Sequence, residues 1–182
     1  MKKTIAVLLV VLASMPTAGW AVYVCADDRG KTSVQDRPCP EKKASTTNLP
    51  LGARELSDRN SIETVNRFYK AMSERDPTAA SRFLADTFTS EVRRRNQPTV
   101  NDDKASLTEG LHQVLSAAKS YNAKTACRVA NRSPAAYSLS CHVDEHGIVM
   151  NQSHRTVSNQ AVTVVLDGGF VKIGRIISEE LE

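Results

Sequence analysis

The spacing of apolar residues along this chain changes once, from a helical period to a strand period. Between residues 56 and 120, apolar side chains recur at steps of three and four, and after Ser120 they alternate with polar ones. Steps of three and four place side chains on one face of a helix, whereas alternation places them on one face of a strand. The sequence therefore predicts helices first and a sheet afterwards.

Three helices are predicted in the first part. Asp76 and Pro77 have the pattern of an N-cap followed by a first helical position, so they separate the first helix from the second. Ser106 and Glu109 have the spacing of a capping box for the third helix. The apolar faces of the three helices comprise Ile62, Val65, Phe68, Tyr69 and Met72; Ala80, Phe83, Leu84 and Phe88; and Leu107, Leu111, Val114, Leu115 and Ala118.

Five strands are predicted in the second part, with turns near Pro134, at His146-Gly147 and at Asp167-Gly168. Three helices followed by an antiparallel meander indicate an α+β fold, in which the helices pack on one face of a curved sheet. The predicted strands cover residues 121–129, 137–143, 148–157, 162–166 and 170–177.

The four cysteines form two pairs of equal spacing. Cys127 and Cys141 are symmetric about the turn at Pro134, so the hairpin sets them opposite each other, close enough for a disulfide. Cys25 and Cys39 flank a short hairpin, where a disulfide would contribute about 3 kcal/mol. Four cysteines allow three pairings, and zinc is disfavoured because no Cys-x-x-Cys pair occurs.

The first 21 residues have the pattern of a cleaved secretory signal. Two lysines precede an apolar run too short to span a bilayer, and small residues precede a cut after Ala21. We therefore expect export to the periplasm, or secretion, where disulfides persist. The predicted organisation is a disulfide-stapled hairpin over 22–40, a polar linker over 41–55 and one α+β domain over 56–182, with no transmembrane segment in the mature chain.

Charge and motifs exclude several functions. The net charge of +4 at pH 7 is small and the basic residues are scattered, so nucleic acid is not expected as a partner. No nucleophile motif, phosphate-binding glycine loop or cofactor motif occurs, and no cofactor is predicted. His142, Asp144 and His146 share a strand face, but a polar outer face explains them better than a metal site. The basic run 93–95 is interpreted as a solvated helix end.

The N-terminal hairpin resembles a small module found after signal peptides in proteobacterial envelope proteins, the domain of unknown function 4124. The resemblance covers about twenty residues. It implies a location in a Gram-negative envelope and supplies no chemistry. The residues that carry it are Tyr23, Cys25, Asp27, Gly30, Asp36, Pro38 and Cys39.

The main domain resembles the nuclear transport factor 2-like superfamily, which includes ketosteroid isomerases, polyketide-cyclase-like enzymes and periplasmic secretion-channel domains. The resemblance lies in Val65-x-Arg67-Phe68-x-x-Ala71-Met72-x-x-x-Asp76 and Phe83-Leu84-Ala85-Asp86, together with the order of elements. It implies a conical pocket between the sheet and the helices. The fold hosts many unrelated activities, so it does not by itself imply one.

The residues that match the isomerase pattern lack its chemistry. Phe68 occupies the place of the phenolic donor and Val92 that of the basic aspartate, and neither can perform proton transfer. Tyr69 and Glu91 would substitute for them only after a one-residue shift. No catalytic residue is therefore predicted, and the pocket candidates are Phe68, Tyr69, Glu91 and His112.

We therefore expect a non-catalytic periplasmic protein that binds a small ligand or an envelope protein partner, with a homodimer through the sheet face as one arrangement. Two alternatives stay open. One is an envelope enzyme of the isomerase or hydrolase type that uses Tyr69, Glu91 and His112. The other is a scaffold component of a secretion or surface system.

Overall fold

The computed structural model describes residues 23–26, 32–35 and 49–181. The chain divides into two compact units, residues 1–43 and 44–182. In the first unit, strands β1 (Tyr23–Ala26) and β2 (Thr32–Gln35) pair antiparallel. The predicted hairpin strands are therefore present. The predicted Cys25–Cys39 disulfide and the cut after Ala21 lie outside the described residues.

A mixed, strongly curved sheet forms the second unit. Its strands lie in the order β5-β4-β9-β8-β7-β6, and a short strand, β3, pairs with β9 from within the stretch predicted as a linker. Strands β4 and β9 are parallel, so the sheet is not the purely antiparallel meander that was predicted. The bounds are β3 Leu51–Gly52, β4 Leu84–Arg93, β5 Val100–Asp103, β6 Ala118–Arg132, β7 Ala136–Val149, β8 Gln152–Asp167 and β9 Phe170–Leu181.

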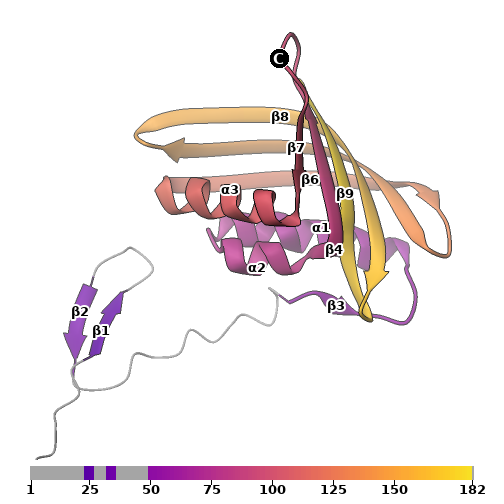
Figure 1. The fold of residues 1–182 in the computed structure, drawn as a ribbon, viewed down its shortest axis with the longest axis horizontal. Coiled ribbons are helices and arrows are strands. Elements are labelled where there is room, and N and C mark those ends of the chain that lie inside the picture. The colour runs from indigo at the N-terminus through magenta and orange to yellow at the C-terminus, as the bar shows by residue number, and fades with distance from the viewer. Residues whose placement is uncertain (1–22, 27–31, 36–48, 182) are drawn as a thin grey trace, which may run out of the picture. The chain divides into compact units, whose positions relative to one another are not determined.

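Three helices of this unit cover one face of the sheet, as predicted (Figure 1). Ser57 caps α1 (Asp58–Ser73) in a capping box with Asn60. Asp76 and Pro77 open α2 (Pro77–Arg82) as the sequence predicts. The third helix, α3 (Lys104–Ala117), is capped by Asp103, three residues before the predicted Ser106–Glu109 box begins. No helix in the described part of the chain is long and apolar enough to cross a membrane.

The second helix is shorter than predicted, because two of the four residues in its predicted apolar stripe, Leu84 and Phe88, belong to a strand. Helix α2 ends at Arg82, and Leu84, Ala85 and Phe88 are buried in β4. The register of β4 against β9 shifts between Leu84 and Thr89. This irregularity breaks the alternation of the strand and leaves inward residues at helix-like steps. Sequence spacing alone therefore indicated the wrong element.

Two predicted turns in the sheet are also corrected. Strand β7 passes through His146-Gly147 and turns at Met150-Asn151, where both residues have positive φ, as a two-residue hairpin loop requires. Strand β8 is continuous where two strands were predicted. The alternation of apolar residues fails there because inward positions 158 and 160 are Ser and Gln, both buried. The predicted turn after Asp167 is confirmed at Gly168-Gly169.

The core lies between the helices and the inner face of the sheet, which we define as the face that the helices cover. The predicted disulfide between Cys127 and Cys141 is present there and joins directly paired residues of β6 and β7, with Cα atoms 4.1 Å apart. The largest fully buried side chains include Phe83, Phe88, Leu84, Leu115, Leu139, Ile173, Val162 and Val164.

Candidate functional site

A pocket of about 270 Å³, here called the inner pocket, lies between helix α1 and the inner face of the sheet. The polar residues of this pocket point inward because they lie on the same face of each strand as the apolar core residues further along. Its lining includes Phe68, Tyr69, Ser90, Ser158, Gln160 and Ser178. A core position occupied by a short polar side chain leaves space that a larger apolar one would fill.

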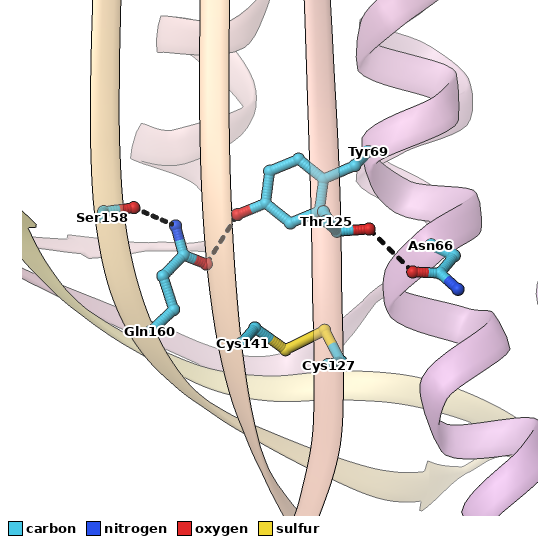
Figure 2. The surroundings of a disulfide bond; sticks show 7 residues. All are labelled: Asn66, Tyr69, Thr125, Cys127, Cys141, Ser158 and Gln160. Carbon is cyan, nitrogen blue, oxygen red and sulfur yellow. Dashed lines mark hydrogen bonds between the residues drawn. A yellow bond between two sulfur atoms is a disulfide. The ribbon is translucent and has the colours of Figure 1, made fainter.

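A hydrogen-bonded chain crosses this pocket from helix to sheet. The hydroxyl of Tyr69 donates to Oε1 of Gln160 at 2.6 Å, and Nε2 of Gln160 donates to Oγ of Ser158 at 3.1 Å. Figure 2 shows this chain beside the Cys127–Cys141 disulfide, whose Cys141 is paired with Gln160 across strands β7 and β8. Burial raises the pKa of Tyr69, so its phenol remains a neutral donor.

Glu145 brings a carboxyl group into the same pocket. The hydroxyl of Tyr121, on the neighbouring strand β6, donates to its Oε1. Tyr121 lies two residues from Ala123, the partner of Glu145 in the β6–β7 register, so the two side chains share the inner face. Burial raises the pKa of Glu145, and the nearby carboxylate of Glu180 raises it further against the opposing effect of the Tyr121 hydrogen bond. This is a carboxyl poised to hold or exchange a proton.

Ser90 supplies an unsatisfied polar atom in the pocket lining. Its side chain lies on β4, the residue is 7% exposed, and its Oγ has no hydrogen-bond partner among the described residues. Buried hydroxyls are normally paired, because an unpaired one loses its hydrogen bonds to water. The hydroxyl of Ser90 is therefore available to a ligand.

A second pocket, of about 550 Å³ and here called the outer pocket, adjoins the first. It lies between helix α3 and the ends of β7 and β8, and Met72, Glu145 and Thr156 line both pockets. We call the two pockets together the cleft. The remaining lining of the outer pocket is mainly apolar and includes Leu107, Leu111, Val114, Leu115 and Val149, with His154 as a polar member. Val114 is 46% exposed, which places it at the rim.

Arg94 lies where the two pockets meet, and it is neutralised within the protein. Its Nε donates to Glu180 at 2.8 Å, and both residues line the inner pocket. The neighbouring Arg93 binds Glu91 and Glu179. The run 93–95 therefore begins at the last residue of β4, and its first two arginines pair with the acidic C-terminal segment, so it is not the solvated helix end that was predicted.

The structure brings together two of the four pocket candidates. Phe68 and Tyr69 line the inner pocket. Glu91 points to the opposite face of β4, where it binds Arg93 and Arg175. His112 is exposed and lines a separate hollow with α2 residue Ser81. The predicted catalytic alternative built on Tyr69, Glu91 and His112 is therefore wrong, because these side chains do not meet.

The two residues that the isomerase resemblance singles out both lie in the inner pocket. Both Phe68 and Val92 line the inner pocket, as the resemblance implies. Neither side chain can donate or accept a proton. Side chains of the inner pocket that can do so include Tyr69 and Glu145, and Tyr121 of the outer pocket donates a hydrogen bond to Glu145.

The histidines of β7 are engaged separately. His142 contacts Asn159, Asp144 binds Arg155, and His146 contacts Ser153. Within residues 49–181, no group of three or more metal-ligating side chains is placed to hold an ion. The three residues follow the polar-face interpretation.

Glu145, Tyr121, Ser90, Ser158 and Gln160 were not identified from the sequence. Ser90 fell in a stretch predicted as helix, and 158–160 fell in a predicted break between strands. The available signal was a polar residue at an inward position of an alternating strand, which Ser158, Gln160 and Glu145 all show. This signal can be recognised only once the bounds of the strands are known.

Comparisons with known proteins show the fold. A scytalone dehydratase-like protein from Novosphingobium aromaticivorans superimposes with a TM-score of 0.57 at 11% identity, covering 68% of this chain and 84% of the other. A ketosteroid isomerase-like protein from Erwinia carotovora atroseptica gives 0.52 at 10% identity, covering 67% and 94%. A dehydratase-like protein of the nuclear transport factor 2-like family from Streptomyces avermitilis gives 0.54 at 8% identity, covering 65% and 91%.

No protein-family model matches the sequence, and no curated protein matches it. The three structural neighbours support the predicted nuclear transport factor 2-like fold, with a curved, open sheet and helices on one face. Identities near one residue in ten carry the fold and nothing about the activity.

Proposed function

We propose that this protein binds a small organic molecule in the cleft and acts as a binding protein in the periplasm. The observation that carries the proposal is the cleft itself, in which an apolar outer pocket leads to a polar inner one. Ligand sites of small molecules combine an apolar lining with a few convergent polar groups. The hydroxyl of Ser90 is one such group, since it is buried and makes no hydrogen bond with the described residues.

The periplasmic location is supported by two observations of different kinds. The N-terminal sequence has the pattern of a secretory signal, and the Cys127–Cys141 disulfide is formed between paired strands. Disulfides persist in oxidising compartments. Fractionation of cells that produce the full chain tests the location, and recovery of the uncleaved chain in the cytosol would contradict it.

A protein partner on the outer face of the sheet has less support than a ligand in the cleft. This face carries ion pairs, among them Asp144 with Arg155 and Glu91 with Arg175. Interface cores are depleted of charged residues. The predicted homodimer through this face stays a prediction, to be tested by the oligomeric state in solution.

A matched pair of variants tests the cleft. Val114 is 46% exposed at the rim of the outer pocket, and Val100 is 44% exposed on β5, outside the lining of both pockets. With Nile red, a neutral apolar dye, as the probe, Val114→Trp should weaken binding at least about fivefold, by about 1 kcal/mol. Val100→Trp should bind like the wild type. Equal binding by all three proteins would overturn the proposal.

The Glu145–Tyr121 pair favours a second candidate, acid–base catalysis in the same cleft. A buried carboxyl with a raised pKa can remove a proton next to a carbonyl, and phenols can stabilise the developing oxyanion. The test is deuterium exchange next to the carbonyl of cyclohexanone, followed by NMR in heavy water. Faster exchange with the wild type that is lost in Glu145→Gln would support catalysis. Exchange at the background rate would exclude it for this class of ketone.

A further inference from the structure

The charge lining the cleft is predominantly negative. Glu145 on β7, Glu180 on β9 and Asp102 on β5 all line the inner pocket. Among the described residues that line this pocket, the cationic one is Arg94, and it is already paired with Glu180 at 2.8 Å. The histidines of the cleft, His146 and His154, lie in the outer pocket. The protein therefore leaves the acidic character of the inner pocket uncompensated.

Glu145 is the most consequential of these acids. Its hydrogen bond comes from the neutral phenol of Tyr121, and no ion pair to Glu145 occurs among the described residues. Tyr69 on α1 and Glu180 on β9 also interact with it electrostatically, and neither is positively charged. Arg94, which lines both pockets with Glu145, is paired with Glu180. A buried carboxylate without a cation is costly. A positively charged ligand would remove that cost by supplying the missing partner.

Aromatic rings also line the cleft. Phe68 and Tyr69 meet edge to face, with centroids 5.1 Å apart and planes at 79°, and both line the inner pocket. Tyr121 lines the outer pocket beside Glu145. Aromatic faces attract organic cations, an interaction worth about 0.5–2 kcal/mol that increases with desolvation. A carboxyl among aromatic rings recognises an ammonium group better than it recognises a neutral or anionic one.

The inner pocket also offers hydrogen-bond acceptors. The Oγ of Ser90 has no partner among the residues that the structure describes, although Ser90 is only 7% exposed. Gln160 directs its Oε1 toward the pocket-lining Tyr69 hydroxyl. An ammonium group has three N–H donors and no acceptor, so it needs such oxygens around it.

We propose that the cleft selects a protonated amine that carries an apolar chain, with the ammonium group beside Glu145 and the chain along the apolar outer pocket. This inference rests on the proposed function, since it names the chemical class of the ligand of the same cleft. The apolar part of the outer pocket, with Leu107, Leu111, Val114 and Val149, provides the surface that the chain would cover.

Three probes that share one chain and differ in the charge of their head group test the inference. Octylammonium, 1-octanol and octanoate are titrated into the mature protein near neutral pH and followed by calorimetry. We expect octylammonium to bind at least about tenfold more tightly than 1-octanol, a difference of about 1.4 kcal/mol, and octanoate to bind most weakly. Equal or tighter binding of 1-octanol or octanoate would overturn the inference.

Two substitutions locate the origin of the preference. Glu145→Gln keeps the size of the side chain and removes its charge, so the tenfold preference for octylammonium should fall to about twofold while 1-octanol binds as before. Glu91→Gln, on the opposite face of the sheet, should preserve the preference. An unchanged preference in Glu145→Gln would contradict the assignment of Glu145.

The outcomes separate this inference from the proposed function. If 1-octanol binds as tightly as octylammonium and Val114→Trp weakens both, the cleft binds ligands and the preference for amines is wrong. If none of the three probes binds and Val114→Trp leaves Nile red binding unchanged, both are wrong.

Discussion

The inner face of the sheet divides into two halves that differ in chemistry although the same strands build them. In the packed half, β8 presents Val162 and Val164, and β9 presents Val171 and Ile173, all fully buried. A few residues along, the inward positions become Ser158 and Gln160 on β8 and Ser178 and Glu180 on β9. Strand β7 changes from Leu139, Cys141 and Val143 to Glu145, and β4 changes from Phe88 to Ser90.

The difference shows that the site is made by a change of side chains along the same strands, next to shifts of register in the β4–β9 and β8–β9 pairings. All four strands change from apolar to polar at adjoining positions, so the polar half lies together as one pocket. The packed half stabilises the fold through burial, at roughly 25 cal/mol per Å² of apolar surface. The hollow half buries less apolar surface and carries polar groups that can bind a ligand. Functional sites commonly depart from close apolar packing in this way.

The largest expected effect contrasts two neighbours on β4. Phe88→Ala removes a fully packed ring, which is 2% exposed, and should lower the free energy of unfolding by about 3–5 kcal/mol. Ser90→Ala removes a hydroxyl with no partner in the described part of the chain, so it should leave stability unchanged or raise it by up to about 1 kcal/mol. Urea unfolding measures both. A loss above about 2 kcal/mol in Ser90→Ala would mean that the two halves are packed alike.

The next effect concerns the Cys127–Cys141 disulfide, which fixes β6 against β7. Replacing both cysteines with serine should lower the free energy of unfolding by about 3 kcal/mol, since the bridge spans a separation of 14 residues. The same register sets Tyr121 against Glu145, so Nile red should also bind more weakly. An unchanged melting temperature in the double variant would show that the strands hold their register without the bridge.

A smaller effect is expected from the buried hydrogen bond at the boundary of the two halves. Tyr69→Phe removes the donor to Gln160 and should cost about 1–2 kcal/mol in unfolding experiments, because a buried acceptor loses its partner. Asn66→Ala removes the exposed bond from Thr125 (Figure 2) and should cost at most about 0.5 kcal/mol. Equal costs would contradict the difference in burial.

The pH dependence of stability distinguishes the buried carboxyl from the exposed ones. Because the folded protein raises the pKa of Glu145 above the ordinary value of 4.5, its contribution is complete below that value and is lost as the pH rises through the raised pKa. The stability of the wild type relative to Glu145→Gln should therefore fall as the pH increases above 4.5. Asp144, whose pKa is lowered by its hydrogen bond with Arg155, should show the opposite trend, with its contribution lost on acidification. Urea unfolding of the wild type and Glu145→Gln at pH values above 4.5 checks the first sign, and unfolding of the wild type and Asp144→Asn at pH values below 3.8 checks the second.

The smallest effect is expected on the outer face of the sheet. Glu91→Gln alters an exposed cluster with Arg93 and Arg175, where solvent screens the charges, so the stability should match that of the wild type. Its Nile red binding should equal that of the wild type. A clear loss of binding would mean that Glu91 takes part in the pocket, as the sequence predicted.

The sequence predicted the parts of the fold that follow from simple periodicity. The helices, the β6–β7 hairpin with its disulfide and the turn after Asp167 all come from uninterrupted patterns. The failures have two physical causes. An irregularity in β4 gave its inward residues helical spacing, and buried Ser158 and Gln160 interrupted the alternation of β8.

Only half of the site could be predicted. Phe68 and Tyr69 lie on α1, where the apolar face was clear, and the helix directs both toward the sheet. The register of β6 and β7 brings Glu145 and Tyr121 together. The spacing of residues around a single turn specifies such a register only approximately. Glu91 was misplaced because its neighbour Ser90 faces inward, and residues next to each other on a strand point to opposite faces.

The most direct test of the account is to map where a ligand perturbs the two halves of the inner face. Amide resonances of the ¹⁵N-labelled mature protein are followed during titration with octylammonium. The account predicts shifts confined to the hollow half and its rim, at Ser90, Glu145, Ser158 and Ser178, with little change at Leu139, Val162 and Val164. Shifts centred on the packed half or on the outer face of the sheet would contradict it.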